Sequence, residues 1–308
     1  MRYVKIDTRA TIVGLGELLW DRLPSGPQLG GAPTNFIYYT SLLGAEGIIA
    51  TCVGEDRLGS LAIDKVAGFG LTTDWIQRDQ IHPTGTVDIT IGSNGEPNFN
   101  IEQNAAWAFM SWTNEWQVLA SRVDLVCFGT IARYQTYSAN TINAFIDAMK
   151  PSALRIFDVN LRQKLYSPLL LEKLFQQSDI VKLNAQELLV VGNILNIEGK
   201  DLEAKAEGLL ARYKLDIVCV TKGSEGSILL SPTETVIHNG VKVQVADTIG
   251  AGDAFTATLA CGYLNHIPLQ NISEGANQLS AWVASRPGAT PVVDENILFD
   301  IRQNLYQY

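Results

Sequence analysis

A glycine-rich segment ahead of a helical pattern is the strongest chemical signal in the sequence. The segment DTIGAGD ends at Asp253 and is followed by AFTATLACGYL, which has an amphipathic helical pattern. The segment predicts that the backbone N–H groups of Gly250, Ala251 and Gly252 lie at the helix start, where the macrodipole favours an anion. Asp253, in the first turn, suits a general base beside a transferring phosphoryl group. The alternative is an acid that only complements the macrodipole.

A second glycine pair, Gly30-Gly31, opens a predicted helix over 34–44 in the segment LGGAPTN. Paired glycines let a ligand approach the backbone closely. The Asn35 side chain offers one acceptor and two donors, which match sugar hydroxyls. The alternative is an ordinary strand-to-helix turn capped by Thr34.

Three polar segments follow apolar strand-like runs: DVNLR (158–162), KLNAQE (182–187) and TKGSEG (221–226). In open α/β sheets ligands lie beyond the carboxyl ends of the strands, so each segment is well placed for binding. The alternative for DVNLR is a turn with a surface arginine, Arg162. The alternative for TKGSEG is a tight hairpin turn rather than a contact to nucleotide phosphate.

The segment KLNAQE has two interpretations. Asn184 ends a strand, and Glu187 stands three residues later, which is the spacing of a capping box. The functional alternative is a magnesium or water network, because hard cations take oxygen ligands. Asp21, beside Trp20, is either a solvated acid or a ligand contact.

Short apolar runs alternate with helical patterns along most of the chain. Strand-like runs occupy 10–17, 47–54, 123–130, 154–160, 179–184 and 215–223, and helical patterns occupy 34–44, 57–69, 138–150, 168–177 and 201–213. Nearly continuous Val- and Ile-rich runs suit strands buried on both faces of a parallel sheet. We therefore expect a doubly wound α/β fold.

Two stretches, 17–31 and 84–102, interrupt this alternation and resemble hairpins. The second alternates polar and apolar residues from Val87 to Ile91, with SNGEP as its turn. We expect the two stretches to combine into a small lid sheet. Three further short strands (SILLSP, ETVIHN and KVQVA) follow residue 223, and the chain is almost wholly helical from about 252.

Composition excludes several classes of protein. The 308 residues are 46% hydrophobic and 18% charged, which is too apolar for a disordered chain, and no run is long enough for a membrane helix. MRYVKIDTRA lacks the apolar core of a secretory signal, so we expect a cytoplasmic protein. With 23 basic and 32 acidic residues the net charge is −9 and no basic run occurs, which argues against a nucleic-acid partner.

Other catalytic classes have little support. The four cysteines have no zinc-ligand spacing and the three histidines do not pair, so a metal centre or a Ser-His-Asp triad is unexpected. Gly14-Leu15-Gly16 lacks the third glycine and the helix of a dinucleotide fingerprint, and GxxxxGK[ST] is absent.

Taken together, GGAPTN, DVNLR, KLNAQE, TKGSEG and DTIGAGD resemble the ribokinase-like (PfkB) carbohydrate kinases in order and spacing over essentially the whole chain. The pairing of GGAP with D-x-N-x-R is most similar to the bacterial fructokinase branch. The resemblance implies one domain over 1–308, with a three-layer αβα core around a mostly parallel sheet and a β lid. It also implies ATP-dependent phosphorylation of a sugar hydroxyl.

The resemblance also implies roles for single residues. Asp253 resembles the catalytic base, with Gly250, Ala251 and Gly252 as the anion hole and Arg162 near the phosphates. The sugar contacts that it implies are Asp21, Gly31 and Asn35. The nucleotide contacts that it implies are Asn184, Thr221, Lys222, Gly223 and Gly226. Glu187 resembles a residue that organises Mg²⁺ through water, and Asp247 and Thr248 resemble part of a monovalent-cation (K⁺) site.

This sequence departs from the resemblance at two places. No arginine occurs over 99–104, where related fructokinases and keto-deoxy-sugar-acid kinases often carry one. A sugar acid needs a partner for its carboxylate, so a neutral sugar is favoured unless Arg133 replaces that arginine, although the same gap is also a departure from the fructokinases. Phe36, Tyr38 and Tyr39 stand where small residues are usual. We expect fructose as the substrate. The alternative substrates are ribose, a nucleoside and 2-keto-3-deoxygluconate. A further alternative is a sugar-binding protein without catalytic activity. Exposed strand edges in the lid suggest a homodimer.

Overall fold

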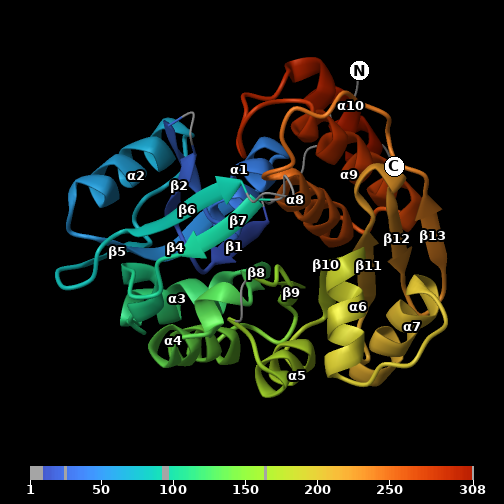
Figure 1. Ribbon diagram of the computed structural model, residues 1–308, viewed down its shortest axis with the longest axis horizontal. Helices are drawn as coiled ribbons and strands as arrows, with labels where there is room; N and C mark the ends of the chain where they lie inside the picture. Colours follow the sequence, from blue (N-terminus) through green and yellow to red (C-terminus); the bar gives the residue numbers. More distant parts are fainter. Residues whose placement is uncertain (1–9, 24–25, 92–96, 163–164, 307–308) are drawn as a thin grey trace.

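The computed structural model describes residues 10–23, 26–91, 97–162 and 165–306, and within them a large sheet of nine strands runs through the molecule (Figure 1). From edge to edge the strands are β13 (Thr235–His238), β12 (Ser227–Leu230), β11 (Ile217–Thr221), β10 (Ile180–Asn184), β9 (Leu154–Asp158), β8 (Leu125–Gly129), β1 (Thr11–Leu15), β4 (Glu46–Gly54) and β5 (Ile76–Asp79). The seven strands from β11 to β5 are parallel, and β12 and β13 add antiparallel pairs at one edge.

Helices cover both faces of this sheet. One face packs against α3 (Asn114–Arg122), α4 (Thr136–Asp147), α5 (Pro168–Gln176), α6 (Ala185–Ile194) and α7 (Leu202–Tyr213). The other face packs against α1 (Ala32–Leu42), α2 (Arg57–Gly68), α8 (Ala251–Leu264), α9 (Leu269–Ala284) and α10 (Glu295–Tyr306). Short 3-10 turns form η1 (Ala106–Phe109), η2 (Ile131–Arg133) and η3 (Gly223–Glu225). This arrangement confirms the predicted three-layer αβα fold.

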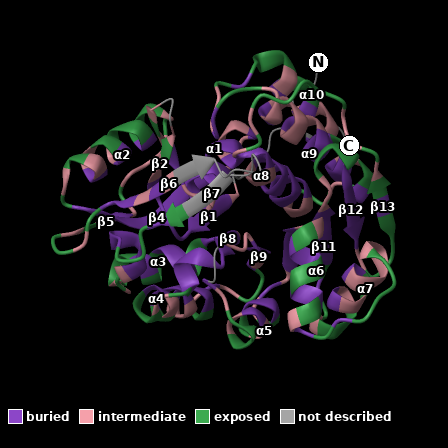
Figure 2. Ribbon diagram, viewed as in Figure 1, coloured by how far each residue is buried: buried purple, intermediate pink, exposed green. Residues whose placement is uncertain are grey.

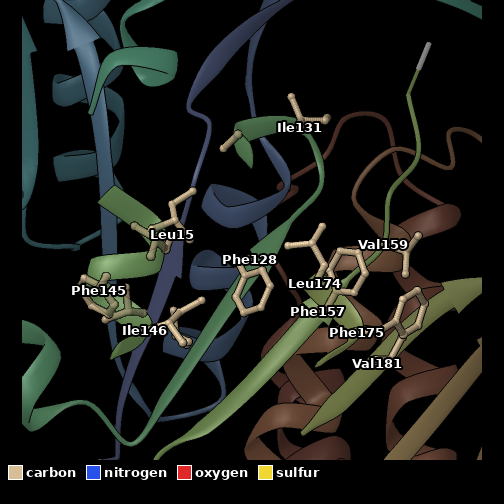
Figure 3. Close-up of a cluster of buried hydrophobic side chains, with 14 of the residues drawn as sticks. Leu15, Phe128, Ile131, Phe145, Ile146, Phe157, Val159, Leu174, Phe175 and Val181 are labelled. Atoms are coloured by element: carbon tan, nitrogen blue, oxygen red, sulfur yellow. The ribbon is translucent and has the colours of Figure 1, made fainter. Parts of the chain in front are cut away.

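The central strands are mostly apolar because both of their faces are covered. In β1, Ile12 belongs to the core on one face and Val13 to the core on the other, and both side chains are buried. On the face that carries α4 and α5, Phe157 lies between Phe128 and Phe175, with ring centroids 5.9 and 5.4 Å apart (Figure 3). Figure 2 shows the buried strands in the interior and exposed residues on the outer helices.

A second sheet of four strands combines the two stretches that interrupted the α/β alternation. Its order is β3 (Gly26–Gly30), β2 (Leu19–Leu23), β6 (Gly85–Ile91) and β7 (Pro97–Ile101). The inner pair β2 and β6 is parallel, and both outer pairs are antiparallel. The predicted turn SNGEP falls largely on 92–96, which lie outside the described residues.

Some elements differ from the sequence-based predictions. The predicted strand KVQVA is wrong, because residues 242–246 form no regular structure and Val245 is exposed. Neither β5 nor α3 was predicted from the sequence. The four cysteines are free and buried, as expected. Among the described helices none has both the length and the apolar character needed to cross a membrane.

Candidate active site

A cavity of about 750 Å³ lies between the carboxyl ends of the large sheet and the small sheet. Strand ends supply much of its wall, because polar residues follow the apolar runs of β9, β10 and β11. Of the residues predicted for the site, the wall includes Asp21, Gly31, Asn35, Arg162, Asn184, Glu187, Thr221, Gly223, Gly226, Thr248, Gly250, Ala251, Gly252 and Asp253. The fold therefore gathers segments that are far apart in the sequence at one place.

The first turn of α8 forms part of this wall. Gly250 precedes the helix with φ +80°, and a side chain there would collide with the carbonyl oxygen of Ala289, so glycine is required. The first N–H groups of a helix have no preceding carbonyl to bond, and they carry the positive end of the macrodipole. The Ala251 N–H lies 3.3 Å from the carbonyl of Thr248, which leaves Gly252 and Asp253 as the stronger donors to a ligand.

Asp253 is held from the neighbouring helix α1. The Asn35 side chain donates from Nδ2 to Asp253 Oδ2 over 2.8 Å. Helix α1 begins two residues earlier than predicted, with Gly31 as its N-cap at φ 106°, so Thr34 lies inside the helix and is not the cap. A side chain at Gly31 would collide with the backbone of Glu17, so this turn also needs glycine.

Three carboxyl groups, those of Glu17, Asp21 and Asp253, line the same cavity, and each has a raised pKa. Burial raises the pKa of Asp253 to about 6, and the charge of Asp158 adds to the effect. Burial and the charge of Asp253 raise the pKa of Asp21 to about 6. Burial raises the pKa of Glu17 to about 7, although its carboxyl accepts a hydrogen bond from the Ala32 N–H. The Arg162 charge opposes all three shifts.

A buried ion pair under the start of α8 joins Asp158 and Lys182, the first residues of two segments that were predicted for the site, although neither residue was given a role. Lys182 Nζ lies 3.1 and 3.2 Å from the two carboxylate oxygens of Asp158, and Thr256 Oγ1 donates to the same carboxylate over 2.8 Å. Burial alone would lower the pKa of Lys182, but the carboxylates of Asp158, Glu187 and Asp253 together outweigh it and the pKa is raised. A side chain on Gly252 would meet Lys182 Nζ at 2.9 Å, so the ammonium group lies directly against that turn.

Asn184 and Glu187 form a complete capping box at α6, so the structural alternative is confirmed. Asn184 Oδ1 accepts the Glu187 N–H over 2.8 Å, and Glu187 Oε2 accepts the Asn184 N–H over 2.9 Å. Glu187 Oε1 also accepts the Leu161 N–H over 2.9 Å. These bonds fix the orientation of a buried carboxylate in the cavity wall, so the cap and the site are the same feature.

Two predicted site residues do not line the cavity. Lys222 lies in the hairpin turn between β11 and β12, whereas its neighbours in the turn do line the cavity. Asp247 accepts the N–H of Ile249 over 3.0 Å and that of Gly288 over 3.1 Å, so it holds the backbone before α8.

Arg133 does not replace the arginine that is missing over 99–104. Its Nη2 donates to Asn143 over 2.7 Å and to Gln177 over 2.6 Å, on the face of the sheet that carries α4 and α5. Arg133 is buried and outside the cavity wall. The sequence alone could not have shown this, because the direction of an isolated arginine depends on distant packing.

The cavity also includes residues that were not predicted for the site. Val243 and Val245 come from 242–246, which was predicted as a strand, Val241 immediately precedes that segment, and Asn277 and Ala281 come from α9. An apolar wall with few polar groups suits the base of a nucleotide. The alternation of valines in 241–245 is the one signal that could have identified this wall, and it was interpreted as a strand.

Comparisons with known proteins agree with this geometry. A putative sugar kinase of Pyrococcus horikoshii is 29% identical over 277 residues, which cover 86% of this chain and 84% of that protein. A fructokinase of Escherichia coli is 28% identical over 267 residues, covering 80% of this chain and 82% of the relative.

Solved structures share the fold. The crystal structure of an uncharacterized sugar kinase from Pyrococcus horikoshii superposes with a TM-score of 0.84 at 26% identity, covering 96% of this chain and 99% of that one. A structure of that kinase in complex with ATP gives a TM-score of 0.81 at 25% identity, with coverage of 96% and 98%. The family model described as pfkB family carbohydrate kinase matches residues 27–296, and the chain therefore belongs to the pfkB family of carbohydrate kinases.

Proposed function

We propose that this chain transfers the γ-phosphoryl group of ATP to a primary hydroxyl of a monosaccharide, with fructose as the first candidate. The observation that carries the proposal is the position of Asp253. Its carboxyl lies in the cavity wall, is bonded to Asn35, and is placed in the first turn of α8. A proton acceptor and a group of anion-binding N–H donors therefore adjoin one another.

The reaction follows from this arrangement. The sugar hydroxyl attacks the γ-phosphorus in line, its proton passes to Asp253, and ADP leaves with the electrons of the broken P–O bond. Backbone N–H groups of the turn at 250–253, chiefly those of Gly252 and Asp253, stabilise the charge on the equatorial oxygens without reorganising. Arg162 lies in the same wall and adds a positive charge on the phosphate side.

Sugar and nucleotide take opposite ends of the cavity in this proposal. Gly31, Asn35 and Asp21 contact the sugar hydroxyls. Asn184, Thr221, Gly223 and Gly226 contact the nucleotide, with the apolar 241–245 segment against the base. Lys222, which lies outside the wall, would contribute only through its charge. The two binding regions meet at Asp253.

Mg²⁺ fits the wall as an ion held through water. The described residues contain no cluster of three or more His, Cys, Asp or Glu side chains that could hold a metal. Glu187 and Asn184 present fixed oxygen atoms in the cavity wall, which suits a cation that keeps most of its waters and binds phosphate. When bound, Mg²⁺ would neutralise charge on the transferring phosphoryl group.

The evidence for a monovalent cation is weaker. Thr248 lines the cavity but Asp247 does not, so no step depends on K⁺ here. The cation site and the cytoplasmic location stay predictions from the sequence. The small sheet covers the sugar side of the cavity, so we propose that it excludes water as a lid.

A neutral sugar is favoured by the charges around it. On the sugar side the wall carries the carboxyl groups of Glu17, Asp21 and Asp253. The cations that line the cavity among the described residues are Arg162, Lys182 and Lys242, and Lys182 is already paired with Asp158. A sugar acid would bring a further carboxylate next to these three carboxyl groups, which opposes its binding. Several relatives are named fructokinase, which makes fructose the first choice.

The experiment is an ADP-release assay over fructose, ribose, a nucleoside and 2-keto-3-deoxygluconate with Mg²⁺ and ATP. We expect turnover with fructose at a kcat/KM at least tenfold above that for the other acceptors. Higher turnover with another acceptor would show that fructose is not the preferred substrate, and the proposed kinase activity would still stand. Tight sugar binding without turnover on any acceptor would instead support a binding protein of the same fold.

A further inference from the structure

Two adjacent tyrosines on α1 tie this helix to a segment near the C-terminus. The Tyr39 hydroxyl donates to the carbonyl of Ala289 over 2.7 Å, and both groups are buried. The Tyr38 hydroxyl donates to the carbonyl of Pro291 over 2.9 Å. Residues 288–291 do not line the cavity, so these phenols act on the site only through the backbone that they hold.

The Ala289 carbonyl lies against the turn that begins α8. A Cβ atom on Gly250 would come within 2.8 Å of the Ala289 Cα and carbonyl carbon, and closer still to its oxygen. The same carbonyl oxygen therefore accepts the Tyr39 hydrogen bond on one side and packs on Gly250 on the other. Asp247 also holds the segment 288–291 in place, since its Oδ2 accepts the Gly288 N–H over 3.1 Å.

The tyrosine that makes this contact shares a helix face with a residue of the site. Asn35 and Tyr39 are four residues apart in α1, so their side chains lie on the same face, one turn apart. Asn35 bonds directly to Asp253, and Tyr39 reaches Gly250 through Ala289. Helices α1 and α8 pack side by side near the centre of the molecule (Figure 1).

We propose that Tyr39 is a positioning residue for the phosphate end of the site, because its phenol holds residues 288–291 against the turn that presents the anion-binding N–H groups. This inference rests on the proposed function and deepens it. Helix α1 then fixes the base through Asn35 and the anion hole through Tyr39, so the helix that contacts sugar also sets the geometry of phosphoryl transfer. Burial also raises the pKa of Tyr39 above its ordinary value, so the phenol stays a donor at working pH.

The kinetic test compares Tyr39→Phe with Tyr38→Phe. Each variant keeps the ring and removes one hydroxyl that bonds a backbone carbonyl, which makes the two well matched. A displaced catalytic group loses rate steeply, so we expect kcat of Tyr39→Phe to fall about tenfold or more, with the KM for sugar changed less than about threefold. Tyr38→Phe should keep both constants within about threefold, since Pro291 is farther along the segment from Gly250.

A binding test separates this inference from the proposed function. Isothermal titration gives the affinities of AMP-PNP and ADP in the presence of Mg²⁺. The wild-type protein should prefer AMP-PNP through its third phosphate, and Tyr39→Phe should lose that preference while its affinity for ADP stays within about twofold. If the wild type phosphorylated no sugar, the proposed function would fail, and this ratio would still decide the role of Tyr39.

Hydrogen exchange covers the case in which Tyr39→Phe does not fold. In the wild-type protein, AMP-PNP should slow amide exchange at 288–290 together with 250–252, although 288–290 lie outside the cavity. ADP should slow exchange less at both places. The inference is overturned if Tyr39→Phe matches Tyr38→Phe in kcat and in nucleotide preference. It is equally overturned if AMP-PNP protects 250–252 and leaves 288–290 unchanged.

Discussion

At the scale of single residues, the account depends on a carboxylate whose pKa is close to neutral. Burial raises the pKa of Asp253 to about 6, while the hydrogen bond from Asn35 opposes that rise. A general base works best when its pKa lies near the operating pH, because it is then ionised and still accepts a proton readily. Burial and the hydrogen bond from Asn35 therefore act in opposite directions, and together they set the pKa of Asp253 in the range that suits a general base.

The pH dependence of turnover tests this carboxylate. Asp253 must be ionised to act, so kcat/KM should rise about tenfold per pH unit below about 6 and level off above it. Asn35→Ala removes the bond that lowers the pKa, so the acidic limb should move to higher pH. Initial rates between pH 5 and 8 give both profiles. An acidic limb in the same place in both proteins would contradict the assignment.

Glu17 provides a second residue-scale prediction, on stability. Its pKa is about 7 in the folded protein and 4.5 in the unfolded chain, so between these values the folded state holds a proton that the unfolded state has lost. Glu17 therefore makes the free energy of unfolding fall as pH rises from about 4.5 to about 7. Above about pH 7 the destabilisation of the folded protein by Glu17 is complete, and below about pH 4.5 Glu17 does not destabilise it.

Glu17→Gln is uncharged at every pH and removes this contribution. Relative to the wild type, the variant should gain up to about 3 kcal/mol in free energy of unfolding between pH 4.5 and pH 8. Urea unfolding of both proteins at the two pH values measures the difference. A stability difference that does not change with pH would show that the Glu17 pKa is not raised.

At the scale of elements, the turn that starts α8 is the most sensitive to substitution. Gly250→Ala would place a side chain at φ +80° and against the Ala289 carbonyl, so we expect loss of stability and a loss of turnover of about 10² or more. Gly68→Ala is the matched control, because nothing lies within 4 Å of its added Cβ. Thermal unfolding and initial rates of both variants test this, and normal activity in Gly250→Ala would exclude the turn as an anion hole.

Elements were predicted well where local signals agree with tertiary structure. The glycines before α8 determine the conformation of that turn, so the turn was recognised. The apolar runs of the central strands determine which residues are buried, so these strands were recognised as well. The valines at 241–245 alternate as a strand would, yet residues 241–245 join neither sheet and the valines line the cavity instead. Thr34 could not be separated from Gly31 as the helix cap, because the backbone of Glu17 decides that turn.

Contacts between distant segments were beyond the sequence. The bond from Tyr39 to Ala289 spans 250 positions, and the bond from Asn35 to Asp253 spans 218. The resemblance to carbohydrate kinases supplied the second pairing indirectly, by placing both residues in one site. The resemblance did not predict the bond from Tyr39 to Ala289, since small residues are usual at the tyrosine positions in the related kinases.

At the scale of the whole molecule, the small sheet leaves β3 and β7 as outer strands within the described residues. Unpaired strand edges favour association with another chain, so we predict a homodimer through the small sheet. Light scattering after size exclusion should give about twice the chain mass of 33.7 kDa. Hydrogen exchange in β3 and β7 should then slow as the protein concentration rises. A mass of one chain at all concentrations would contradict this.

The large sheet, the small sheet and the cavity between them place one carboxylate beside one helix start, and the central claim is that these two features carry phosphoryl transfer. The most direct measurement is ³¹P NMR of ATP, Mg²⁺ and fructose with the wild-type protein and with Asp253→Asn. We predict a sugar-phosphate resonance with the wild type. We predict a rate lower by about 10²–10⁴ with Asp253→Asn, which should still fold and bind sugar. More than a tenth of the wild-type rate in Asp253→Asn would contradict the account.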